Sequence, residues 1–241
     1  MVLCRKMNAM IDQHNTDFDQ DALLARYQDE MRRDGYVPGL PKQQLADVTR
    51  YCDAKQREAL IMWHQFAPED TARIVARELA HFASCDSFTW KVYADDMPAN
   101  LSTVLQTAGF TAETESALMV CAVDKLLAIT LPPSEVDIQS LNGRHDISQL
   151  RCVWDQVWPG ETSGWVDVLA DELDVSPRQL HILVANVNNT PVASGYIIVD
   201  PRQTFAYLGG GATITSERVV DTIVASSLRA HALLPTLKHV I

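Results

Sequence analysis

The sequence is poor in the residues that build metal centres and disulfide frameworks. Its 241 residues include only five cysteines and seven histidines. It has no CxxC pair and no HExxH motif, so we expect neither a metal site nor a fold held together by disulfides. An odd number of widely separated cysteines favours a reducing compartment, and we expect a cytoplasmic protein. The cysteines are Cys4, Cys52, Cys85, Cys121 and Cys152.

Positive charge and long apolar runs are also scarce. Lysine and arginine number 20 against 31 acidic residues, which gives a net charge of −11. That balance argues against nucleic acid and anionic membrane as partners. No apolar run reaches transmembrane length, and no apolar segment near the start predicts a signal peptide. Because 47% of the residues are apolar, the chain can bury a core, and its length favours about two domains.

The first half of the chain alternates between strand-like and helix-like patterns. Residues 1–34 are polar and weakly helical, and glycines and prolines over residues 35–41 end that pattern. The spacing then predicts β-β-α-β-α-β. The expected strands are 46–51, 59–66, 88–93 and 110–123, and the expected helices begin at Pro68 and Pro98. The buried stripe of the first of these helices is predicted to be Ala72, Val75, Leu79 and Phe82.

The second half begins after a linker that contains Pro132-Pro133. Its pattern predicts β-α-α-β-β-β-α-β, with Asn188-Asn189 in the turn between the second and third strands. The expected strands are 136–141, 180–187, 192–199, 205–213 and 237–241, and the expected helices are 147–158, 162–173 and one that begins near Ser216. The domains are therefore predicted as a helical extension over 1–40, a half-domain over 41–125, a linker over 126–133 and a second domain over 134–241.

Several segments in this order resemble the GNAT acetyltransferase family. Residues 191–196, 205–206 and 210–213 resemble the third and fourth strands of bacterial GNAT domains. Residues 88–93, followed by Gly109-Phe110, resemble the divergent half-domain that precedes the catalytic domain in one group of the family. The resemblance implies an α/β fold in which a GNAT-like half-domain precedes a truncated GNAT acyltransferase domain. It also implies mixed, mostly antiparallel sheets flanked by helices.

The resemblance also implies acetyl-CoA as the cofactor. In relatives, the fourth strand leads into a turn of the type Arg/Gln-x-x-Gly-x-Gly/Ala, whose backbone N–H groups hold the cofactor pyrophosphate. The cofactor-binding residues that this implies here are Gly210, Gly211, Ala212, Thr213 and Arg218.

The turn itself departs from the family pattern. Val219 and Asp221 stand where the family has glycines, and Glu217 adds a second acid. Valine is stiff and bulky, and the two acids oppose a pyrophosphate at a helix N-terminus. We therefore expect weak or absent acetyl-CoA binding.

No catalytic base stands out. Glu161 and Asp200 are candidates by position, as is Glu217, but each also reads as an ordinary surface acid. Trp158 and Trp165 lie where the family's first two helices cover the acceptor pocket, but we favour core or lid packing as their role. The glycines at 209–211 are explained either by a bulge that serves a thioester carbonyl or by a close-packed strand end.

Two functions remain open on these residues. One is acetyl transfer from acetyl-CoA to an unidentified amine, impaired by the altered turn; the other is a non-catalytic remnant or protein-interaction module with a GNAT fold. Family members continue with another helix and two strands beyond the position of residue 241. The edge of the strand predicted at 237–241 would then be open, with Val240 and Ile241 exposed, which predicts a homodimer.

Overall fold

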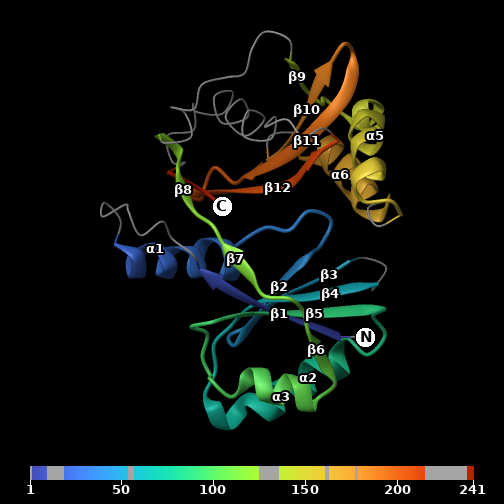
Figure 1. Cartoon of the computed structure of the whole chain (residues 1–241). Helices are drawn as coiled ribbons and strands as arrows, with labels where there is room; N and C mark the ends of the chain where they lie inside the picture. The colour runs from blue at the N-terminus through green and yellow to red at the C-terminus, as the bar shows by residue number, and fades with distance from the viewer. Residues whose placement is uncertain are drawn as a thin grey trace. The chain divides into compact units, whose positions relative to one another are not determined.

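The computed structural model describes residues 2–9, 19–53, 57–124, 136–160, 163–176, 179–214 and 238–241. It divides into two compact units, Met1–Met119 and Val120–Ile241. Each unit has its own sheet with helices beside it (Figure 1). The expected α/β class, with two mixed sheets flanked by helices, is confirmed. The predicted linker over 126–133 lies outside the described residues.

The first unit contains a mixed sheet. Its strands are β1 (Val2–Ala9), β2 (Lys42–Gln44), β3 (Val48–Cys52), β4 (Glu58–His64), β5 (Ser87–Tyr93), β6 (Phe110–Ala112) and β7 (Ser116–Leu118). The strand order is β2-β3-β4-β5-β1-β6, and β7 also pairs with β1. Pairing is antiparallel from β2 to β4 and parallel from β4 through β5 and β1 to β6.

The strand at the start of the chain corrects the sequence-based expectation. Residues 1–34 were expected to be weakly helical, yet Val2–Ala9 form β1 and pair in parallel with β5 on one side and with β6 and β7 on the other. Strand β1 supplies backbone hydrogen-bonding groups to both β5 and β6. A helix could not do so, because its backbone groups are paired with one another. Helix is found only later in this segment, as α1 (Gln20–Tyr27) and the π-helical turn η1 (Gln28–Arg33). Asp19 caps α1 by accepting a hydrogen bond from the Ala22 N–H at 3.1 Å.

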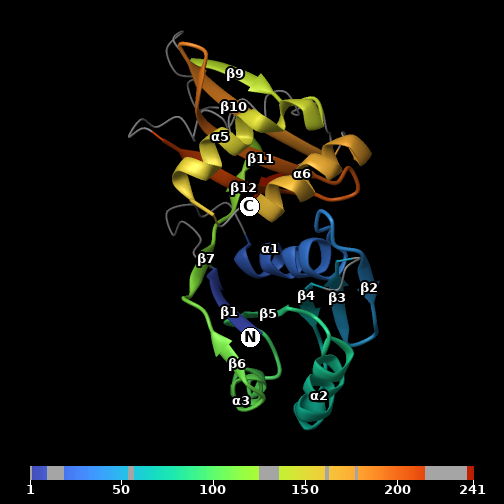
Figure 2. The same cartoon turned by 90° about the vertical axis from the view of Figure 1, so that its right-hand side faces the viewer.

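Helices cover both faces of the first sheet (Figures 1 and 2). The 3-10 turn η2 (Pro68–Asp70) leads into α2 (Thr71–His81). Helix α3 (Leu101–Thr107) is followed closely by Gly109, whose φ is +96°. Both helices pack on the face that carries Phe88 and Trp90, whereas α1 lies on the other face. The stripe of α2 differs from the expected one, because Ala72 is exposed. The buried residues of α2 are Thr71, Ile74, Val75 and Glu78.

The second unit is built on a mainly antiparallel sheet. Its strands are β8 (Cys121–Ala122), β9 (Val136–Ser140), β10 (Leu180–Val187), β11 (Thr190–Val199), β12 (Phe205–Thr213) and β13 (His239–Val240), in the order β8-β13-β12-β11-β10-β9. The single strand expected over 110–123 is therefore wrong: β6 and β7 belong to the first sheet and β8 to the second. The helix expected near Ser216 lies outside the described residues.

Local chemistry explains the centre of this sheet. Asn188 and Asn189 both have positive φ, 52° and 61°, which suits a two-residue hairpin turn with the twist of its strands. Strands β10 and β11 are buried along most of their length. The turn η3 (Arg144–Asp146) precedes α5 (Ile147–Val157), and α5 and α6 (Ser163–Val175) lie together on one side of the sheet (Figure 1). Leu150, Val153 and Trp154 of α5 are buried there.

Candidate functional site

A β-bulge interrupts the pairing of β11 with β12. Gly210 and Gly211 of β12 lie opposite the single residue Gly195 of β11, because the register shifts at this point. Gly210 has a φ of +61°, which side-chain-bearing residues rarely adopt. A bulge of this kind bends the strand and turns its backbone groups away from the ladder.

Aromatic rings on the α5 side fix glycine at two positions of this strand. A Cβ added at Gly210 would overlap the Trp154 and Tyr196 rings, and one added at Gly209 would overlap the Tyr196 ring and hydroxyl. The strand therefore has a packing reason to carry glycine, in addition to the backbone conformation of Gly210. The triple glycine thus both forms a bulge and is closely packed, and the role of the bulge toward a thioester carbonyl stays a prediction.

The rings around the bulge form a connected aromatic cluster. Trp154 contacts Trp158 with ring centroids 5.5 Å apart, and Tyr196 at 6.3 Å. Tyr196 in turn lies 6.2 Å from Tyr207, whose side chain is exposed. The indole N–H of Trp154 donates a hydrogen bond to Ser194 Oγ at 3.0 Å, which satisfies both buried polar groups.

Tyr196 is a titratable group beside the bulge glycines. Burial raises the pKa of its hydroxyl well above the ordinary value, and the neighbouring Tyr207 raises it further. A hydrogen bond with Trp165 acts in the opposite direction. The phenol therefore keeps its proton at neutral pH, so it can donate a hydrogen bond but cannot serve as a base.

Strands β12 and β13 pair in parallel just before the bulge. Phe205 pairs with His239 and Ala206 with Val240, and the Leu208 N–H then donates to the Ile241 carbonyl at 2.6 Å. Gly210 and Gly211 follow in β12, where the bulge lies. Backbone groups at such a place can hydrogen-bond an extended ligand or polarise a carbonyl.

The structure describes some of the predicted site residues and not others. Gly210, Gly211, Ala212 and Thr213 lie together on β12, at and just after the bulge. Arg218 and the acids Glu161 and Glu217 lie outside the described residues, as does the whole turn at 216–221. Sequence reasoning missed Trp154 and Tyr196. The four-residue spacing of Trp154 and Trp158 on one helix is the sequence signal that could have identified Trp154.

Asp200 lies in the turn between β11 and β12. Its carboxylate is buried and accepts hydrogen bonds from the Arg202 side chain, at 2.5 Å from Nη2, and from the Arg202 N–H at 2.9 Å. The Gln203 N–H donates to the Asp200 carbonyl at 2.9 Å. These contacts suit a residue that shapes a turn, so the assignment of Asp200 as a base stays a prediction without geometric support.

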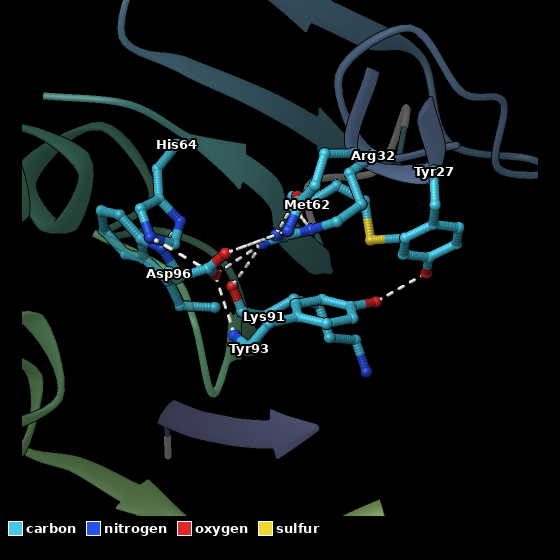
Figure 3. Close-up of polar contacts among 9 residues, drawn as sticks. Tyr27, Arg32, Met62, His64, Lys91, Tyr93 and Asp96 are labelled. Carbon is cyan, nitrogen blue, oxygen red and sulfur yellow. Dashed lines mark hydrogen bonds and ion pairs between the residues drawn. The ribbon is translucent and has the colours of Figure 1, made fainter. Parts of the chain in front are cut away.

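A second polar cluster is buried in the first unit (Figure 3). The Arg32 guanidinium donates to both carboxylate oxygens of Asp96, at 2.6 and 2.8 Å, and to the Met62 carbonyl at 2.8 Å. Its Cζ lies 3.9 Å from the centre of the Tyr93 ring. Tyr27 and Tyr93 share a hydrogen bond of 2.7 Å between their hydroxyls. These contacts fasten α1 and η1 to β4 and β5.

His64 completes this cluster but is unsuited to acid–base work at neutral pH. The Trp90 indole N–H donates to His64 Nδ1 at 3.2 Å, which places the proton of the neutral ring on Nε2, 3.5 Å from Asp96. Burial lowers the pKa of His64 to about 4; Asp96 opposes this shift and Arg32 adds to it. Burial raises the pKa of Asp96, but the Arg32 hydrogen bonds and charge outweigh burial and leave it below the usual range. The cluster is architectural.

Two classes of site find no support in the part of the chain that the structure describes. No group of three or more His, Cys, Asp or Glu side chains there is arranged to hold a metal ion. No helix there is long and apolar enough to cross a membrane.

Comparisons with known proteins identify the fold. No family model matches the chain. No curated protein matches it. Among solved structures, a GCN5-related N-acetyltransferase from Kribbella flavida is 12% identical, with a TM-score of 0.56 over 84% of this chain and 78% of that one. A functionally unknown conserved protein from Staphylococcus epidermidis is 16% identical, with a TM-score of 0.58 over 86% of this chain and 84% of that one.

These two matches extend over both units, so the chain has a GNAT-type fold. Shorter matches include a predicted acetyltransferase from Clostridium acetobutylicum solved with acetyl-CoA. It is 18% identical with a TM-score of 0.34 over 44% of this chain and 79% of that one. Similarity of that extent says nothing about the cofactor of this chain.

Proposed function

We propose that this is an acetyltransferase-like protein that transfers an acetyl group from acetyl-CoA to an amine, with weakened affinity for acetyl-CoA. The observation that carries the proposal is the bulge at Gly210 and Gly211 of β12, within a GNAT-type fold. Backbone donors at such a bulge suit the thioester carbonyl, on which negative charge develops during attack by the amine.

Acetyl transfer to an amine requires few catalytic side chains. A neutral amine attacks the thioester carbon, its proton passes to a base or to water, and CoA leaves as the thiolate. The fold contributes mainly proximity and orientation. The protonated Tyr196 hydroxyl, which lies against Gly209, is placed to stabilise charge rather than to accept the proton of the amine.

Weakened affinity rests on the sequence of the turn that follows β12. The proposed pyrophosphate ligands include Arg218, but Val219 and Asp221 replace the flexible residues that let backbone N–H groups approach a phosphate. Two acids within this segment oppose an anionic ligand.

A non-catalytic binding module is the second candidate. The observation in its favour is the close packing of Trp154 and Tyr196 against Gly209 and Gly210, which accounts for both glycines without any ligand. In this second function the protein binds a protein partner and uses neither an amine substrate nor acetyl-CoA.

Calorimetric titration with acetyl-CoA separates strong from weak binding. We expect no saturation at micromolar ligand for the natural sequence. A variant with Val219→Gly, Val220→Arg and Asp221→Gly should bind at least tenfold more tightly, about 1.4 kcal/mol. Low-micromolar binding by the natural sequence would contradict the weakened affinity.

The release of CoA, measured by chromatography with a panel of primary amines, separates the two functions. Release that depends on the amine supports acetyl transfer. Binding of acetyl-CoA without release for any amine, in both the natural sequence and the triple variant, would favour the binding module.

A further inference from the structure

Two cysteine thiols meet in the first unit, far from the β12 bulge in sequence. Cys52 ends β3, and Cys85 lies between α2 and β5. Their sulfur atoms are 3.8 Å apart although the residues are 33 positions apart in the chain. Both side chains are half-buried, so solvent reaches the two thiols. Both also pack against the same apolar core, which holds them in place.

We propose that Cys52 and Cys85 form a reversible disulfide by exchange with a small disulfide of the glutathione type. A disulfide bond is about 2.05 Å long, so the two sulfurs must approach by less than 2 Å from their present separation. Side-chain rotation supplies movement of that size. Among the described residues, neither sulfur belongs to a group of side chains that could hold a metal ion. The Cys52 thiol also reaches the Asp53 carbonyl at 3.5 Å.

The exchange is balanced without a further reagent. The Cys52 sulfur attacks oxidised glutathione, forming a mixed disulfide as the glutathione S–S bond breaks and one glutathione thiolate leaves. The Cys85 sulfur then attacks Cys52 Sγ, the internal bond forms, and the second glutathione leaves. The two protons of the cysteines end on the two reduced glutathione molecules.

The surroundings of Cys85 favour Cys52 as the sulfur that attacks first. Burial raises the pKa of its thiol to about 11, and the hydrogen bond and charge of Cys52, with Asp53 and Asp86, act in the same direction. Cys85 is therefore protonated at neutral pH and a slow first attacker.

Closure of the bond would tie the end of β3 to the segment that leads into β5. The cross-linked loop contains β4 and α2, so the bond would restrict the unfolded chain over much of the first unit. A change in the redox poise would then change the stability of this unit. This site is independent of acetyl transfer.

The experiment uses the full chain in glutathione buffers of increasing oxidised fraction. Intact mass spectrometry should show the loss of two hydrogen atoms, and peptide mapping should find a cross-link between the peptides that contain Cys52 and Cys85. The melting temperature should rise by about 5 °C or more on oxidation. Cys52→Ser and Cys85→Ser should each abolish both the cross-link and the rise.

Cys152→Ser is the matched control, because Cys152 is exposed and lies in the other unit. This variant should keep the Cys52–Cys85 cross-link and the rise in melting temperature. Glutathione adducts without an internal bond in the natural sequence would overturn the proposal. So would a cross-link between other cysteines, or oxidation-dependent stabilisation that persists in Cys52→Ser and Cys85→Ser.

Discussion

Arg32 and Asp96 form a two-point ion pair inside the first unit, with nitrogen–oxygen distances of 2.6 and 2.8 Å. Only 1% of the Arg32 side chain and 7% of the Asp96 side chain are exposed. The pair joins η1 to the segment that follows β5, so two parts of the chain 64 residues apart depend on one another.

Asp96→Asn should lower the free energy of unfolding of the first unit by about 3–5 kcal/mol, because it leaves the buried Arg32 charge without a counter-ion. Urea denaturation measures this loss. Asp70→Asn is the matched control, since Asp70 pairs with the exposed Arg73 at 2.8 Å. The control should lose less than about 1 kcal/mol. Equal losses would mean that the buried pair adds no more than a surface pair.

His64 should make the stability of the first unit depend on pH. Its folded pKa, about 4, lies below the unfolded value of 6.5, so the unfolded state binds the extra proton between these values. The contribution of neutral His64 is therefore complete above pH 6.5 and is lost as the pH falls toward 4. Asp96, whose pKa is lowered, loses its contribution only at still lower pH.

His64→Gln tests this directly, because glutamine keeps an acceptor for the Trp90 indole without titrating. Between pH 6.5 and 4, the natural sequence should show an unfolding free energy that falls with a slope approaching about one proton, and the variant a flatter curve. Equal slopes in the two proteins would place the acid sensitivity elsewhere.

Sequence reasoning succeeded where a pattern was local. The bounds of β10 and β12 are those expected, because buried strands read as apolar runs that end at turn residues. It failed where the partner came from a distant element. Glu78 of α2 is buried, and its ion-pair partner Arg50 comes from β3, which no spacing within α2 predicts.

The candidate site shows the same division. The glycines of β12 carry a strong sequence signal, because three glycines in a row within a strand indicate a bulge or close packing of the backbone. Their packing against Trp154 and Tyr196 depends on how α5 lies on the sheet, which the sequence does not specify. The strand β1 was missed because its polar residues lack the alternation of a half-buried strand.

The homodimer was predicted because the strand at 237–241 was expected to have an open edge. In the structure, β13 has β12 on one side and β8 on the other, where His239 pairs with Ala122 and Val240 with Cys121. The edge is thus partly covered within one unit. The prediction remains a dimer, measured by light scattering on a sizing column at micromolar concentration. A monomer that does not aggregate would show that the two residues of β8 suffice.

Asp200 should act on stability rather than on chemistry. Asp200→Asn weakens the hydrogen bonds that hold the turn between β11 and β12, and we expect a loss of about 1–3 kcal/mol in unfolding free energy. Arg202→Ala removes the side-chain partner of the buried Asp200 carboxylate, so it should lower stability in the same direction as Asp200→Asn. Loss of acetyl transfer in Asp200→Asn with unchanged stability would instead restore Asp200 as a catalytic base.

Gly210 and Gly164 should respond in opposite ways to the same substitution. At Gly210 an alanine must adopt a φ of +61° and its Cβ overlaps the Trp154 and Tyr196 rings. Gly210→Ala should therefore cost about 2–5 kcal/mol in unfolding free energy, from strain and overpacking together.

Gly164 lies in α6 with an exposed surface, and an added Cβ there would meet nothing within 4 Å. Gly164→Ala should stabilise the protein by up to about 1 kcal/mol, because alanine has less conformational freedom to lose on folding. Thermal and urea unfolding of the two variants measure both effects. Tolerance of Gly210→Ala would mean that β12 does not hold the bulge. If the variant were stable and also released CoA from acetyl-CoA, the bulge would be dispensable for acetyl transfer as well.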